Sequence, residues 1–300
     1  MSVTLHNANC FDVFASLPDA SVDMVCVDPP YGTTSIKWDN VLNFSDMWVA
    51  LERIVKPTGN IIIFGSQPFT SLMITSKIDW FRYELIWNKN KCGSPGLAKI
   101  RPQKVHENIM IFSRESGATY NPIMESGGAY KRVAKDQEKG YGSGINNHGY
   151  GFAKKPLLGS ENSGTRYPKS ILHASRNFSA QQTVHPTQKP TNILNWLLMT
   201  YSNGGDTVMD FTMGSGSCGV SAVMTGRNFI GIEQDTDYYN IANARISGTT
   251  PNVVGPLDFQ LTTQIPETMK TVPDAKHEVG VLEKLRSGTI SNDPADTLFE

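Results

Sequence analysis

Residues 21–39 of the chain read SVDMVCVDPPYGTTSIKWD. The apolar run at residues 25–27 favours a short buried strand, because β-branched side chains suit a pleated sheet. The strand must end at Asp28, since the two prolines that follow remove backbone donors from the ladder. The sequence therefore predicts a carboxylate, a rigid turn and the ring of Tyr31 at the carboxyl end of a strand, where open α/β sheets bind ligands.

The Asp-Pro-Pro-Tyr turn offers hydrogen-bond acceptors. Pro29 and Pro30 carry no backbone N–H, so we expect the carbonyls of Asp28 and Pro29 to lack nearby donors and to accept from an amino group of a ligand. A simpler interpretation is a strand-ending turn in which Asp28 caps the backbone and Tyr31 packs on the sheet. A glycine-rich motif at residues 210–219, described below, favours the ligand site.

The composition is typical of a globular α/β protein. The 300 residues include 39% hydrophobic side chains and carry a formal net charge of −1, which fits one large domain with an insertion or two modest domains. No apolar run approaches the roughly 18 residues of a membrane-spanning helix and no leader is visible, so we expect a cytoplasmic protein without a membrane partner. Cys10, Cys26, Cys92 and Cys218 form no Cys-x-x-Cys pair, so we expect neither a metal site nor a disulfide framework.

Strand and helix patterns alternate along the chain. This order predicts a doubly wound, mostly parallel α/β sheet of seven strands, with room for an antiparallel pair at one edge. Residues 57–60, Pro-Thr-Gly-Asn, are expected to end the second helix. The expected strands lie at residues 3–5, 25–27, 61–64, 83–87, 107–112, 207–209 and 229–232, and the expected helices at residues 11–17, 44–55, 69–76, 192–201, 220–225 and 237–246.

Residues 114–184 differ in composition from the rest of the chain. They are rich in Gly, Ser, Asn, Tyr, Lys and Arg and lack a long periodic apolar pattern. Basic side chains outnumber acidic ones, and interleaved tyrosines suit contact with bases and sugars, so this region is predicted to bind DNA. A solvated surface loop is the alternative. The residues expected to contact DNA are Lys131, Arg132, Lys135, Lys154, Lys155 and Arg166.

A glycine-rich turn lies between an expected strand and an expected helix. Residues 210–219 read DFTMGSGSCG. Glycines in such a turn allow a ligand to approach the backbone closely, and Glu233 at the tip of the next strand can bind two ribose hydroxyls. The pattern predicts an adenosine-containing cofactor, and a nicotinamide dinucleotide would satisfy it as well.

Three motifs follow one another in a recognisable order. Asp-Pro-Pro-Tyr at residues 28–31 precedes the basic region, which His-Pro-Thr-Gln-Lys-Pro at residues 185–190 and the glycine loop follow. Over residues 3–246 the chain resembles the β-group amino DNA methyltransferases, in which the catalytic motif precedes the cofactor motif by circular permutation. The resemblance implies a Rossmann-like methyltransferase fold with S-adenosylmethionine as cofactor. It divides the chain into a catalytic half (1–113), a target-recognition insertion (114–184), a cofactor-binding half (185–247) and a peripheral tail (248–300), where residues 279–285 suggest a short helix.

The resemblance also implies roles for individual residues. Asp28, Pro29, Pro30 and Tyr31 would be catalytic, and Lys37 and Trp38 would contact DNA. The family's usual Asp-Pro-Phe opening of the glycine loop is Asp-Phe-Thr in this chain, and an asparagine at position 9 replaces the acid of many members. The residues expected to bind the cofactor are Asn9, Asp28, His185, Thr187, Lys189, Asp210, Phe211, Thr212, Gly214, Ser215, Gly216 and Glu233.

The implied reaction is methylation of the N6 amino group of adenine in double-stranded DNA. Acceptors at Asp28 and Pro29 would orient the amino group, and Tyr31 would stack on a base that has left the duplex. The chain has no Pro-Cys pair, which argues against attack on carbon 5 of cytosine, because that reaction needs a cysteine nucleophile. The alternatives are methylation of cytosine N4, of RNA or of a protein glutamine, and a DNA-binding protein of this fold without turnover. A homodimer and a cognate restriction endonuclease are further associations that the resemblance allows.

Overall fold

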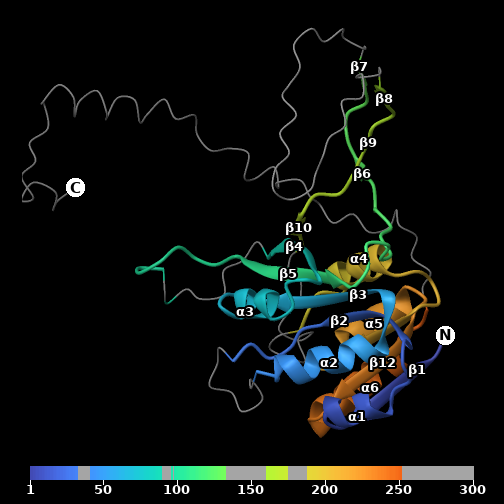
Figure 1. The fold of residues 1–300 in the computed structure, drawn as a ribbon. Coiled ribbons are helices and arrows are strands. Elements are labelled where there is room, and N and C mark those ends of the chain that lie inside the picture. The colour runs from blue at the N-terminus through green and yellow to red at the C-terminus, as the bar shows by residue number, and fades with distance from the viewer. Residues whose placement is uncertain (33–40, 90–95, 97, 133–159, 175–187, 252–300) are drawn as a thin grey trace, which may run out of the picture. The chain divides into compact units, whose positions relative to one another are not determined.

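The computed structural model describes residues 1–32, 41–89, 96, 98–132, 160–174 and 188–251 (Figure 1). In this described part, no helix is long and apolar enough to cross a membrane. Several predicted features lie outside it: Lys37, Trp38, Lys135, Lys154, Lys155, His185, Thr187 and the helix expected at residues 279–285.

The centre of the described chain is a sheet of eight strands in the order β1-β12-β11-β2-β3-β5-β4-β10. Every pairing is parallel except those that β5 makes with β3 and β4. The predicted doubly wound, mostly parallel sheet is confirmed, but its antiparallel strand lies inside the sheet and not at an edge. The strands are β1 (Val3–Asn7), β2 (Val22–Val27), β3 (Val55–Gly65), β4 (Phe81–Asn88), β5 (His106–Ser113), β10 (Ile171–His173), β11 (Thr207–Asp210) and β12 (Asn228–Glu233).

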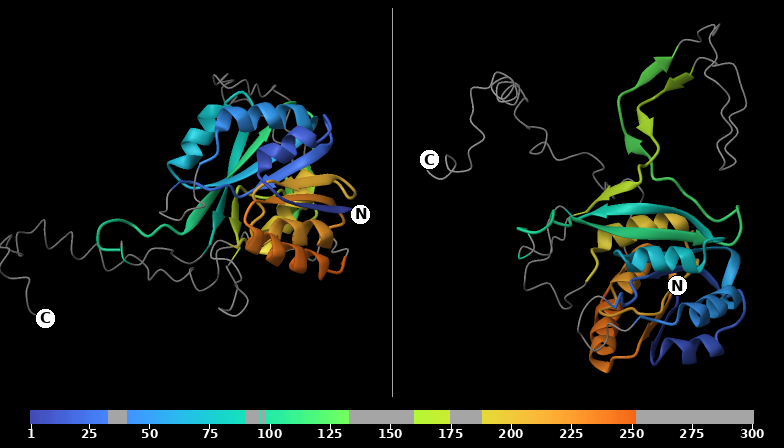
Figure 2. Two further views of the ribbon diagram at one scale, coloured as in Figure 1. Left: turned by 90° about the horizontal axis from the view of Figure 1, so that it is seen from below. Right: turned by 60° about the vertical axis from the view of Figure 1, so that its left-hand side comes forward.

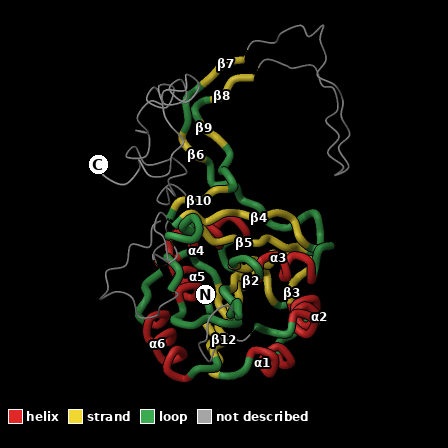
Figure 3. Tube along the Cα trace, turned by 90° about the vertical axis from the view of Figure 1, so that its left-hand side faces the viewer, coloured by secondary structure: helices red, strands yellow, loops and turns green. Residues whose placement is uncertain are grey.

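The sheet has one strand more than the seven predicted. β10 comes from the region expected to be an insertion, and it pairs in parallel with β4. Leu172 is fully buried there, and the indole of Trp87 donates a hydrogen bond of 2.8 Å to the carbonyl of Ala174. A three-residue strand is too short to show a period in the sequence. The same region also forms two small antiparallel ribbons (Figure 3), β6 (Glu125–Ser126) with β9 (Thr165–Arg166) and β7 (Tyr130–Arg132) with β8 (Ser160–Asn162).

Helices cover both faces of the sheet because the strand side chains alternate in direction. In β2, Met24 and Cys26 belong to one buried cluster, whereas Val25 and Val27 belong to the other. The first cluster includes side chains of α4, α5 and α6 and the second those of α1, α2 and α3, which lie on opposite sides of the sheet (Figure 2). The helices are α1 (Cys10–Ser16), α2 (Phe44–Ile54), α3 (Phe69–Ser76), α4 (Thr191–Tyr201), α5 (Ser217–Met224) and α6 (Thr236–Ser247).

The prediction that residues 57–60 end the second helix is wrong. β3 begins at Val55, directly after α2, so these residues lie in a strand and do not terminate a helix. Val22 pairs with Val55 and Met24 with Asn60, and a register shift between the two pairs accommodates the extra residues. The buried side-chain amide of Asn60 donates to backbone carbonyls far along the chain. These distant hydrogen bonds stabilise a strand that the local Pro-Thr-Gly-Asn pattern argues against.

Candidate active site

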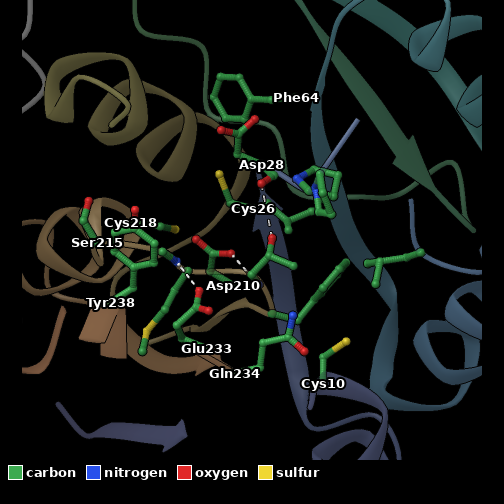
Figure 4. Close-up of a pocket in the computed structure, with 18 of the residues that line it drawn as sticks. Cys10, Cys26, Asp28, Phe64, Asp210, Ser215, Cys218, Glu233, Gln234 and Tyr238 are labelled. Carbon is green, nitrogen blue, oxygen red and sulfur yellow. Dashed lines mark hydrogen bonds between the residues drawn. The ribbon is translucent and has the colours of Figure 1, made fainter. Parts of the chain in front are cut away.

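A cavity of about 840 Å³ opens at the carboxyl ends of the central parallel strands (Figure 4). β1, β12, β11 and β2 run parallel, so the residues that end or follow them meet at one edge of the sheet. Asn9 follows β1, Asp28 follows β2, Asp210 ends β11 and Glu233 ends β12, and all four line the cavity. The topology thus brings together side chains from both ends of the sequence.

Asp28 has three hydrogen-bonding neighbours. Its Oδ1 accepts a hydrogen bond of 2.5 Å from the hydroxyl of Tyr31, and its Oδ2 accepts one from the ammonium group of Lys189. Its backbone carbonyl accepts a hydrogen bond of 3.3 Å from the hydroxyl of Thr212. The prediction that this carbonyl lacks a donor is therefore wrong, because the glycine loop reaches it from the neighbouring strand. Asp28 can offer a ligand its carboxylate, whose oxygens have further lone pairs.

The remaining residues of the turn combine both interpretations of the motif. Within the described chain, no group donates to the carbonyl of Pro29, so this acceptor agrees with the prediction. The ring of Tyr31 packs on Phe69 at the start of α3, with ring centroids 5.0 Å apart. Tyr31 therefore packs on the fold with its ring and orients Asp28 with its hydroxyl.

A row of alternating charges leads from Asp28 toward β4 and β5. The Nζ of Lys189 lies 3.3 Å from Oε2 of Glu107, and Glu107 accepts a hydrogen bond of 2.9 Å from Lys89 through its other oxygen. The side chains of Lys189 and Glu107 are 7% and 12% exposed, so water screens these charges poorly. Sequence reasoning identifies Lys189 and misses Glu107. The sequence gives little indication of Glu107, because this residue reaches the site edge only through the antiparallel direction of β5.

Glu233 connects the glycine loop to the start of α6. Its Oε2 accepts from the N–H of Gly214 and its Oε1 from the N–H of Asp235, both at 2.9 Å. Burial raises the pKa of this carboxyl, and the two N–H donors oppose the rise. Each oxygen has a further lone pair that can accept from a hydroxyl of a ligand. The contact with a ribose stays a prediction.

Asp210 is a buried acid beside other acids. Burial raises the pKa of its carboxyl to about 8, the N–H of Thr212 lowers it, and the negative charges of Asp28 and Glu233 raise it further. Among the described residues that line the cavity, Lys189 is the only lysine or arginine. The cavity therefore has an excess of acidic groups and favours a cationic ligand.

The glycine loop meets the prediction in part. Gly214 and Ser215 line the cavity, whereas Gly216 is not among the lining residues. Gly216 has a φ of 78°, and a Cβ at this position would lie 2.8 Å from the Cβ of Ala242 on α6. Backbone conformation and helix packing require this glycine. The geometry does not support its prediction as a cofactor contact.

Three other predicted cofactor residues have structural partners. Phe211 is buried, and its ring meets that of Phe14 edge-on with centroids 5.4 Å apart. The side chain of Asn9 caps α1 by accepting a backbone hydrogen bond, and the hydroxyl of Ser215 accepts one of 2.9 Å from Arg245. All three predicted residues also line the cavity, so these roles are compatible with ligand contact.

Buried thiols line the cavity as well. Cys10, Cys26 and Cys218 are free and buried, as the sequence predicts, but their place at the site was not predicted (Figure 4). Burial raises the pKa of Cys10 to about 11, so this thiol stays protonated near neutral pH. Such a thiol is a weak nucleophile and acts as an apolar wall.

Comparison with known sequences assigns the chain to a family. The model of the N6/N4 methyltransferase family, described as DNA methylase, matches residues 22–244. The chain belongs to this family of DNA methylases. The Type II methyltransferase M1.MboII of Moraxella bovis is 29% identical over 258 residues, which cover 80% of this chain and 94% of the relative. The Type II methyltransferase M.HinfI of Haemophilus influenzae is 24% identical, with 86% and 71% covered.

Solved structures share the fold of this DNA methylase. The M1.HpyAVI–SAM complex matches with a TM-score of 0.54 and 20% identity over 81% of this chain and 98% of the other. The cytosine-N4-specific PvuII DNA methyltransferase matches with a TM-score of 0.59 and 14% identity over 86% and 90%. The structural similarity supports a common Rossmann-like methyltransferase fold. The sequence identities are too low to distinguish the target base.

Three residues expected to contact DNA, Lys131, Arg132 and Arg166, lie on the two small ribbons. Lys131, exposed on β7, lies 3.4 Å from Glu161. The guanidinium group of Arg166 donates to backbone carbonyls of the ribbons and lies 4.8 Å from the ring centroid of Tyr130. Arg132 belongs to the same strand as Lys131. Contact of these residues with DNA stays a prediction for this methylase.

Proposed function

We propose that this DNA methylase transfers a methyl group from S-adenosylmethionine to the N6 amino group of adenine in double-stranded DNA. The proposal rests on the carboxylate of Asp28, which Tyr31 and Lys189 hold in place at the carboxyl end of β2. This carboxylate lines a cavity large enough for a cofactor. The relatives described as Type II methyltransferases support a role in marking DNA against a cognate restriction endonuclease.

The cofactor is S-adenosylmethionine, and the lining residues fit it. Glu233 can accept from ribose hydroxyls, Gly214 permits close approach of the ligand to the loop, and the other acids that line the cavity outnumber Lys189 and favour a cationic ligand. When bound, the cofactor supplies a methyl group on a positively charged sulfur. The excess of carboxylates around the cavity stabilises that positive charge.

The residues of the turn orient the target nitrogen. The carboxylate of Asp28 and the carbonyl of Pro29 accept hydrogen bonds from the target amino group, which directs the nitrogen lone pair away from the ring of the base. Lys189 and Tyr31 fix the orientation of Asp28 before the base arrives. The target base leaves the duplex to reach this site, because a stacked base keeps its amino group inside the helix.

The choice of adenine rests on Asp28, the first residue of the Asp-Pro-Pro-Tyr motif. An aspartate at this position resembles the adenine enzymes of the family. The test is to incubate the protein and labelled cofactor with duplex DNA, hydrolyse the product to nucleosides and identify them by mass spectrometry. N6-methyladenine supports the proposal. N4-methylcytosine would show the cytosine enzyme, and no labelled nucleoside on DNA of any sequence would favour a binding protein without turnover.

A further inference from the structure

The connection between β4 and β5 is basic, although it lies outside the expected target-recognition region. Residues 89–106 contain no aspartate or glutamate. In the described part of this connection, Lys99 and Arg101 are exposed, whereas Lys89 and Lys104 are half-buried. The formal net charge of −1 for the whole chain conceals this local excess of positive charge.

The topology places this connection beside the candidate active site. β4 runs in the same direction as β2 and β3, so its last residues lie at the edge where Asp28 follows β2. The described residues 98–105, which lead into β5, extend from this edge of the sheet (Figure 1). The N–H of Lys89 donates to the carbonyl of Val105 at 2.8 Å, which brings the two ends of the connection together.

Lys104 lies near two other basic groups and beside the end of β3. The Nζ of Lys104 donates a hydrogen bond of 2.5 Å to the hydroxyl of Ser66, which directly follows β3. Burial, and next the positive charge of Lys89, lower the pKa of Lys104, the negative charge of Glu107 raises it, and the positive charge of Arg101 lowers it. Lys104 and Arg101 are not among the residues that line the cofactor cavity. The described basic groups therefore repel one another, and an anion bound outside the cavity would relieve that repulsion.

We propose that Lys99, Arg101 and Lys104 form a phosphate-binding edge that holds the DNA backbone next to the target base. The proposal rests on the proposed function and adds a contact surface to it. DNA fits this edge because the base must enter the cavity at Asp28 while its flanking phosphates stay outside. Phosphate contacts position a duplex without reading its sequence. The described Lys131 and Arg166 already have partners on the ribbons, whereas Lys104 donates to Ser66 beside the candidate active site.

The experiment compares two double variants of the full-length protein that remove the same charge. Arg101→Gln with Lys104→Gln removes two groups of the phosphate-binding edge. Lys56→Gln with Arg82→Gln removes two groups near the amino-terminal ends of β3 and β4, at the opposite edge of the sheet. DNA affinity is measured as a function of salt, KM for DNA and kcat are measured in the transfer assay, and cofactor affinity and thermal midpoint test the fold of both variants.

We expect the edge variant to flatten the slope of log affinity against log salt by about 1.8, because each lost phosphate contact changes it by about 0.9. Its KM for DNA should rise several-fold while kcat and cofactor affinity stay near wild type, and the control should keep the wild-type slope. Equal slopes and equal KM values for the two variants would overturn the phosphate-binding edge and leave the methylase function intact. A wild-type protein that transfers no methyl group to DNA would overturn the proposed function and this surface with it.

Discussion

At Asp28, an asparagine would keep the shape of the side chain and remove the negative charge that Tyr31 and Lys189 now contact. We predict that Asp28→Asn lowers kcat by at least about 100-fold, because a preorganised group facing the reacting nitrogen has an effect of that order. Asp79→Asn, at a 66% exposed side chain, serves as control. Near-normal turnover of Asp28→Asn on DNA would contradict the catalytic assignment.

Glu233 is assigned to the cofactor and not to the target base. We predict that Glu233→Gln weakens S-adenosylmethionine binding by about 1.5–3 kcal/mol, or about 10- to 100-fold, through the loss of charge-assisted hydrogen bonds. The measurement is titration calorimetry, with Glu52→Gln at an exposed position as control. Equal affinities for the variant and the wild type would remove Glu233 from the cofactor site.

Asp210 should make stability depend on pH. Its carboxyl has a pKa of about 8 in the fold, against an ordinary value of 3.8, so between these values the folded protein holds a proton that the unfolded chain releases. The contribution of this group to stability is therefore full below pH 3.8 and is lost as the pH rises to about 8. We predict that the unfolding midpoint in urea falls more steeply from pH 6 to pH 8 in the wild type than in Asp210→Asn. Parallel pH profiles would show that Asp210 is ionised throughout this range.

The sequence identifies some site residues better than others for a physical reason. Asp28, Asp210 and Glu233 each follow or end a short apolar run, and the carboxyl ends of parallel strands meet, so their convergence could be predicted. Glu107 is the second residue of β5, and its place at the site depends on the antiparallel pairing of this strand. Gly216 is required for helix packing. Its contact with the cofactor stays a prediction, because the local pattern does not show whether a glycine near a helix start serves a ligand or a neighbouring helix.

At the scale of elements, α5 and α6 pack through Gly216. Gly216→Ala places a Cβ 2.8 Å from Ala242 at a φ of 78°, whereas Gly226→Ala meets a φ of 73° with no atom within 4 Å. Both substitutions incur backbone strain of about 1–3 kcal/mol, but the first also forces two helices apart. We predict a lower urea midpoint for Gly216→Ala than for Gly226→Ala. Equal losses of stability in the two variants would mean that α5 and α6 can move apart to accommodate the Cβ without a loss of free energy.

Element predictions succeed where the pattern is local and long enough. The helix expected at residues 69–76 is α3 with the same bounds, and the helix at residues 192–201 begins one residue earlier as α4. β10 was missed because its three residues are held by pairing with β4 and by Trp87. β3 starts early because distant carbonyls bind the side chain of Asn60. Long-range contacts override local propensity in both strands.

At the scale of the whole molecule, the two basic regions would share the binding of DNA. The ribbons belong to the region expected to read sequence, whereas the proposed phosphate-binding edge adjoins the candidate active site. Phosphate contacts give affinity and salt dependence, and base contacts give specificity. A chain with a net charge of −1 can therefore bind a polyanion through local patches while its other surfaces repel it.

The described helices and strands all lie between Val3 and Ser247, which predicts that residues 1–251 form a complete folding unit. We predict that a protein ending at residue 251 keeps its free energy of unfolding, measured in urea, within about 0.5 kcal/mol of wild type, as expected for a change away from the core, and keeps its cofactor affinity. A protein ending at residue 235 is the control. It lacks α6, whose Ala242 and Ile246 are buried against Gly216 and Gly219 of the neighbouring helix.

Loss of α6 uncovers a core cluster at one end of the sheet, where burial of one large aliphatic side chain is worth about 1.5–3 kcal/mol. The control should accordingly lose several kcal/mol or fail to fold, while the longer protein behaves as wild type. A loss of more than about 1 kcal/mol in the protein ending at residue 251 would contradict the prediction. The stability of the sheet would then depend on residues 252–300, and the expectation of a peripheral tail would be wrong.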